Sequence, residues 1–160
     1  MFPEGEKPND DIPALFAVGA SYQLSPKTKL EASFNYFFAE DVDWDGSEEY
    51  LANEYEGGLA IEYSLTDALS ASAGYIYSTT SATKEFQNDL RYGLESHTVG
   101  LGARYSVNEK FKLDAGVLNA FYTDMDVTIN ELNGQPLPFT INRNYNKTAT
   151  VLAIGASYSL

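Results

Sequence analysis

The sequence predicts an all-β fold of antiparallel, up-and-down strands that cross a membrane as part of a β-barrel. Three observations lead to this fold class. Apolar residues alternate with small or polar residues in about seven stretches of roughly eleven residues, the connections alternate between very short and long, and no stretch has a helical period. Strands of this length cross a bilayer at a tilt, and short turns on one side with long loops on the other are typical of outer-membrane barrels.

The first four expected strands form two hairpins. In the first strand, Ala14 and Phe16 lie on one face, whereas Ala17 and Gly19 lie on the other. A Ser-Pro-Lys turn and a Thr-Asp turn close the two hairpins, because these residue types favour tight turns, and a polar loop separates them. The four strands are expected at residues 14–24, 29–39, 58–65 and 69–77.

A third hairpin and a final strand complete the predicted row. The hairpin, with an Asn-Glu turn, is expected at residues 98–107 and 111–117, and the last strand at residues 148–160. The longest loop, residues 123–147, lies between them and contains an Asn-Gly pair that is typical of a two-residue hairpin turn. This loop is therefore expected to form a small hairpin of its own.

Tyrosines mark one end of four of the strands. A Tyr-x-aliphatic pattern occurs at Tyr22, Tyr63, Tyr105 and Tyr158, of which the first three run straight into a short turn and the fourth ends the chain. Tyrosine is enriched where a barrel meets the membrane surface. The pattern therefore predicts an aromatic girdle at the short-turn end.

Composition excludes several classes of protein. The net charge of −13 makes nucleic acid a poor partner, and no run of 18 apolar residues exists that could form a helical membrane span. The absence of cysteine excludes disulfides and thiol chemistry. The N-terminus lacks the basic and apolar regions of a signal peptide, so we expect either a cytosolic chain or a mature or truncated piece of an exported protein.

The second face of the predicted strands is rich in Gly, Ser, Ala and Thr and has only scattered charges. A soluble sandwich would bury its apolar face against another sheet and place long charged side chains on the wet face. Small residues instead suit a crowded or water-lined lumen. A soluble meander, such as a lipocalin-like barrel, remains the alternative.

The chain resembles the outer-membrane long-chain fatty-acid transporters of the FadL/TodX type, the outer membrane protein transport family. The resemblance rests on the order and spacing of three features: Asp11-Ile12-Pro13-Ala14 before the first strand, three strands that end in G-x-x-Y, and the segment 126–130 after the sixth strand. The G-x-x-Y ends run from Gly19 to Tyr22, Gly102 to Tyr105 and Gly155 to Tyr158.

This resemblance implies a 14-stranded barrel, plugged by an N-terminal domain, of which residues 1–160 form the C-terminal half. It implies passive uptake of hydrophobic molecules such as long-chain fatty acids across a bacterial outer membrane, without enzymatic activity or a cofactor. A structural or adhesive barrel and a soluble lipid-binding barrel are the alternatives. An odd number of strands independently indicates a partial barrel, because single-chain bacterial barrels have even numbers and lipid does not tolerate open edges.

The expected partners follow from the same resemblance. They are membrane lipid, a hydrophobic small molecule, the missing N-terminal half of the barrel, and the barrel-assembly machinery. The last seven residues also resemble the C-terminal signal that the assembly machinery recognises, with Gly155, Tyr158 and an apolar terminus, although Leu160 stands where Phe is usual.

Candidate ligand-binding residues lie on the lumen face and in the long loops. Charged residues on the lumen face are expected to pair with one another, because a charge turned inward needs a partner; the functional alternative is a carboxylate-binding spot at Arg104 or Lys112. Ile76 and Leu118 share that face and are candidates to contact an apolar ligand. The lumen charges are Lys29, Glu31, Glu56, Glu62, Arg104, Lys112 and Asp114, and the loop candidates for first capture are Phe86, Leu90, Tyr92, Leu132, Leu137 and Phe139.

A metal site and an enzyme are both weakly indicated. Asp41, Asp43 and Asp45, followed by Gly46, match the opening of a calcium loop, but the position of the bidentate Glu is Ala52 and the flanks are strands. We therefore expect a solvated acidic loop, with a looser calcium site as the alternative. The single histidine, His97, excludes His-based triads and clusters, and no phosphate loop or nucleophile elbow occurs.

Overall fold

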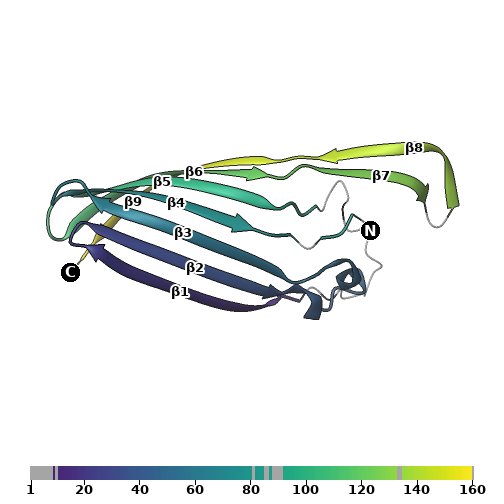
Figure 1. Cartoon of the computed structure of the whole chain (residues 1–160), viewed down its shortest axis with the longest axis horizontal. Helices are drawn as coiled ribbons and strands as arrows, with labels where there is room; N and C mark the ends of the chain where they lie inside the picture. Colours follow the sequence, from purple (N-terminus) through teal and green to yellow (C-terminus); the bar gives the residue numbers. More distant parts are fainter. Residues whose placement is uncertain are drawn as a thin grey trace.

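A computed structural model of the chain describes residues 9, 11–80, 82–84, 87, 92–132 and 135–159, with the backbone alone for Ser47 and Leu132. Seven of its strands form one antiparallel sheet in the order β1-β2-β3-β4-β5-β6-β9 (Figure 1). The seven strands predicted from sequence are confirmed. They are β1 (Ala14–Ser25), β2 (Thr28–Phe38), β3 (Glu54–Ser64), β4 (Leu69–Ser78), β5 (Ser96–Ser106), β6 (Phe111–Tyr122) and β9 (Thr148–Tyr158).

The long segment between β6 and β9 forms a second, two-stranded sheet. Its strands, β7 (Met125–Leu132) and β8 (Gln135–Tyr145), pair antiparallel and follow β6 and precede β9 almost without interruption. Figure 1 shows this hairpin extending well beyond the other strands. The prediction of a hairpin is confirmed, but the expectation that it would be small is wrong, since β8 is as long as most strands of the main sheet.

Polar side chains close the three short turns. The hydroxyl of Thr66 accepts hydrogen bonds from the backbone N–H groups of Ala68 and Leu69, and the amide oxygen of Asn108 accepts from those of Lys110 and Phe111. Such local side-chain bonds fix tight turns and thereby the register of the strands that they join. The register places all four tyrosines of the Tyr-x-aliphatic pattern at this end of the sheet.

The opposite end of the sheet holds the longer connections. Two short 3-10 helices, η1 (Ala39–Asp41) and η2 (Ser47–Tyr50), lie between β2 and β3. Among the described residues, no helix has the length and apolar character needed to cross a membrane. A small apolar cluster of Leu94, Val127 and Tyr145 packs where the β7–β8 hairpin meets the segment before β5.

The two faces of the main sheet differ in exposure and in chemistry. Along β3 the exposure alternates strictly from Leu59 to Ser64, and the large apolar residues are on the more exposed face. Leu59, Leu101 and Leu152 are 67%, 65% and 80% exposed, and Ile154 is 94% exposed. We call this apolar side the outer face and the opposite side, with Gly, Ser, Ala and Thr, the inner face. The described part of the chain contains no large side chain that is fully buried.

The main sheet is open. β1 and β9 are its two edge strands, and because five antiparallel strands lie between them they run in the same direction. The structure thus confirms an all-β, antiparallel, up-and-down sheet without closing it into a barrel. Closure of these strands on themselves would need a parallel pair at the seam, unlike any other pair in the sheet.

This geometry predicts that residues 11–159 alone do not form a stable closed barrel, because the unpaired backbone groups of both edges would face lipid. In detergent, the isolated chain should migrate at the same position on a denaturing gel with and without heating. A closed transmembrane barrel, treated identically, is the control and should shift on heating. A heat-shifted monomer from the isolated chain contradicts the prediction.

Candidate functional site

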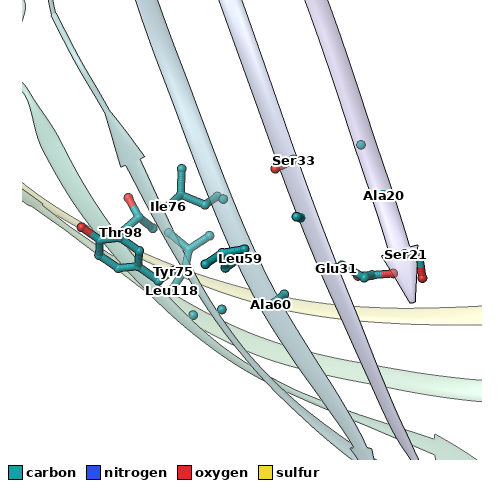
Figure 2. Close-up of a pocket in the computed structure, with 15 residues that line it drawn as sticks. Ala20, Ser21, Glu31, Ser33, Leu59, Ala60, Tyr75, Ile76, Thr98 and Leu118 are labelled. Carbon is teal, nitrogen blue, oxygen red and sulfur yellow. The ribbon is translucent and has the colours of Figure 1, made fainter. Parts of the chain in front are cut away.

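The inner face of the sheet contains a groove of about 530 Å³. Its residues come from β1 to β6 (Figure 2). Ile76, Thr98 and Leu118 lie toward the β4–β6 side, whereas Ser21 and Glu31, which are register partners, lie toward the β1 side. Ile76 and Leu118, predicted from the alternation to lie on this face, both line the groove.

Glycine creates this groove. A Cβ atom added to Gly58 would lie 2.7 Å from the hydroxyl oxygen of Ser33 and 3.4 Å from Cγ1 of Ile76. A Cβ atom on Gly102, farther along the same face, would lie 2.6 Å from the hydroxyl oxygen of Ser72. Larger side chains at these positions would displace their neighbours. The small residues therefore leave the groove open and free of long polar side chains.

Toward the short turns, the inner face becomes charged. Lys29 Nζ lies 3.1 Å from a carboxylate oxygen of Glu31 and 3.8 Å from one of Glu62, its register partner on β3. Farther along the sheet, Arg104 Nε donates a hydrogen bond of 2.7 Å to Asp114 Oδ1. We call these five residues the ionic strip.

A second groove, of about 380 Å³, lies over part of the strip and is lined by Glu62, Arg104 and Asp114 together with Ile154 and small residues. The predicted ligand residue Arg104 therefore reaches a groove, but with a carboxylate of the chain already on its guanidinium group. Lys112, the other predicted cation, forms no hydrogen bond or ion pair with the described residues and lines neither of these two grooves.

The prediction that inner charges pair is confirmed for the five residues of the ionic strip. Glu56 is held differently, because Asn35 Nδ2 and the Ser78 hydroxyl donate hydrogen bonds of 3.1 Å and 2.9 Å to its carboxylate. Sequence reasoning did not anticipate these neutral partners. Asn35 pairs in register with Glu56, and Glu56 with Ser78. These partners could therefore have been predicted from the strand register but not from the search for opposite charges.

Comparison with known proteins gives the family. The model of the family described as "Putative MetA-pathway of phenol degradation" matches residues 10–125, well over half of the chain. The chain belongs to this family. No curated protein matches the chain.

The fold of this MetA-pathway family member is similar to that of a solved protein. The crystal structure of a Pseudomonas aeruginosa FadL homologue matches with a TM-score of 0.68 and 17% sequence identity, over 91% of this chain and 35% of the other. The resemblance to FadL-type outer-membrane proteins that the sequence indicated is thereby confirmed. The chain spans about a third of the length of that homologue.

The loop candidates for ligand capture in this MetA-pathway family member are only partly described. Phe139, on β8, is 60% exposed, and Tyr92 is 41% exposed with its ring 5.4 Å from that of Tyr145. Leu137 is half-buried on the same hairpin. Phe86 and Leu90 lie outside the described residues, and the side chain of Leu132 is not described.

An aromatic cluster on the outer face near the loop end was missed by sequence reasoning. The rings of Phe34 and Tyr55 lie 6.2 Å apart, those of Tyr55 and Tyr77 also 6.2 Å, and those of Tyr77 and His97 5.0 Å. The Tyr75 hydroxyl makes a 2.6 Å hydrogen bond with His97 Nδ1. His97 lies near the start of β5 and is a member of this cluster.

The acidic loop between β2 and β3 binds the segment that precedes β1. Asn9 donates from Nδ2 to Asp43 and from its backbone N–H to Asp45, at 2.8 Å and 3.0 Å, and Trp44 Nε1 donates to the backbone oxygen of Asp11 at 2.7 Å. No group of carboxylates in the described part of the chain could hold a metal ion, so the calcium alternative at Asp41, Asp43 and Asp45 gains no support.

Glu48 organises this loop and makes it sensitive to acid. Its carboxylate accepts hydrogen bonds from the backbone N–H groups of Trp44 and Gly46, at 3.1 Å and 2.9 Å. Hydrogen bonds from backbone N–H groups, including its own, hold the pKa of Glu48 below its usual value of 4.5. A lowered pKa in the folded loop means that the stabilisation is present above pH 4.5 and is lost as the pH falls through the folded pKa.

The single tryptophan reports on this loop. We predict that Trp44 fluorescence is constant from neutral pH down to about 4.5 and changes below it, as protonated Glu48 releases the backbone of Trp44 and Gly46. Glu48→Gln should show the acid-type emission already at pH 7. Glu49→Gln, the matched control, removes the same charge and should leave the profile unchanged; equal effects of both variants contradict the prediction.

Proposed function

We propose that the chain forms part of the wall of a bacterial outer-membrane channel for the passive uptake of hydrophobic molecules. The observation that supports this most directly is the inverted arrangement of the sheet. Its large apolar side chains are on the exposed outer face, where they suit lipid, and its small and polar side chains enclose the groove on the inner face. A soluble lipid-binding barrel would have the opposite arrangement.

The family and the fold support the same function at a coarser level. Membership in the MetA-pathway family and similarity to a FadL homologue favour a hydrophobic compound as the cargo, whether a long-chain fatty acid or another apolar molecule. In the proposed complete barrel, the free edges of β1 and β9 pair with strands beyond the sheet described here. The last strand, β9, is also the proposed contact of the barrel-assembly machinery.

The proposed route begins at the β7–β8 hairpin. Tyr92 and Phe139 offer exposed aromatic surface for first capture, and Leu137 lies on the same strand as Phe139. From there the cargo passes to the inner groove at Ile76 and Leu118, where glycines leave room for it. Each step uses apolar contact without energy input, as passive uptake requires.

Uptake of radiolabelled decanol by cells whose outer membrane contains the full-length protein tests this proposal. The initial rate should exceed that of cells with an empty vector, and equal rates refute the function. Replacing Tyr92, Leu137 and Phe139 together with Ser should lower the rate at least about threefold, as expected for losing about 0.7 kcal/mol of apolar contact.

A matched control lies on the same hairpin. Thr128 donates a hydrogen bond to Asn142 on its polar face, and both residues are exposed. Thr128→Ala with Asn142→Ala changes the hairpin without removing apolar surface and should leave the rate unchanged. If the control variant lowers uptake as much as the Ser variant, capture by apolar side chains is contradicted.

A further inference from the structure

Two cations of the inner face, Lys29 and Arg104, are already paired with carboxylates of the chain itself. Lys29 has Glu31 at 3.1 Å and Glu62 at 3.8 Å, and Arg104 has Asp114 at 2.7 Å. Within the strip, three carboxylates face two cations, so its net charge is negative. A carboxylate ligand would therefore meet cations that already have carboxylate partners, in a strip of net negative charge.

The larger groove itself provides no positive charge to a ligand. The larger groove is lined by small residues together with Leu59, Tyr75, Ile76, Thr98 and Leu118, and its one charged residue is Glu31. Glu56, toward the loops, has its carboxylate held by Asn35 and Ser78. An apolar molecule in this groove has no charged group to desolvate. A carboxylate would lose its hydration without gaining a hydrogen-bond or ion-pair partner.

We propose that this wall selects uncharged hydrophobic compounds over carboxylates with the same carbon skeleton. The inference rests on the proposed function and deepens it by naming the class of cargo. Asp114 is the positioning residue in this selection, because it occupies the guanidinium group that a carboxylate cargo would need. Lys112 lies outside both grooves and does not alter the selection.

Decanol and decanoate form a matched pair of probes that differ in the charge of the head group at pH 8. Equilibrium dialysis of each radiolabelled probe against the purified full-length protein in detergent, corrected with protein-free micelles, gives two dissociation constants. Decanol should bind about tenfold more tightly, a difference of about 1.4 kcal/mol. Decanoate binding as tightly as decanol, or more tightly, overturns the inference.

Asp114→Asn frees Arg104 and should raise the affinity for decanoate about tenfold, while the affinity for decanol stays constant. The double variant Arg104→Gln with Asp114→Asn removes both charges and should return decanoate to its original affinity, which separates the freed cation from altered folding. Asp126→Asn removes the same charge on the β7–β8 hairpin, where Asp126 accepts from Asn144, and should change neither constant.

The outcomes separate this inference from the proposed function. The role of the Arg104–Asp114 pair is overturned if Asp114→Asn leaves the dissociation constant for decanoate unchanged. It is also overturned if Asp126→Asn raises the affinity for decanoate by the same factor. Failure of both probes to bind, while cells still take up decanol, overturns selection by this wall and leaves uptake standing. Absence of decanol uptake in cells refutes the proposed function itself.

Discussion

The register of the strands is the constraint on which the rest of the structure depends. In a sheet, successive side chains point to opposite faces, so a slip of one residue would move the apolar set inward and the small set outward. The side-chain hydrogen bonds of Thr66 and Asn108 hold two of the hairpins in register at their turns. Every feature of the inner face, from the glycine groove to the ionic strip, follows from this alignment.

The register also explains which parts of the fold could be predicted from sequence. Regular alternation placed Ile76 and Leu118 on the inner face. Because the turn between β5 and β6 is short, counting residues from it along both strands places Arg104 opposite Asp114. The pairing of Lys29 with Glu62 spans a long connection whose geometry no local pattern specifies, so only the structure could show it. Ring contacts such as Tyr77 with His97 depend on side-chain directions that alternation leaves open.

The β7–β8 hairpin is the largest part that sequence reasoning underestimated. Its apolar alternation, as in Val127 and Ile129, is hard to recognise in the sequence because many of the other residues are Asn, Thr or Arg. In addition, two prolines interrupt β8. Prolines are tolerated there because a two-stranded sheet has free outer edges. The hairpin is instead stabilised from one side, where Val127 and Tyr145 are buried against Leu94.

Charge is distributed along the inner face in a way that only the whole sheet reveals. Along β3, the inward residues run from Glu56 through Gly58 and Ala60 to Glu62, so charge occurs at both ends and not in the middle. Neutral donors satisfy Glu56, and a cation satisfies Glu62. Along β3, an uncharged middle thus separates two carboxylates that other side chains compensate. This division follows from the register, which places Asn35 and Ser78 beside Glu56 and Lys29 opposite Glu62.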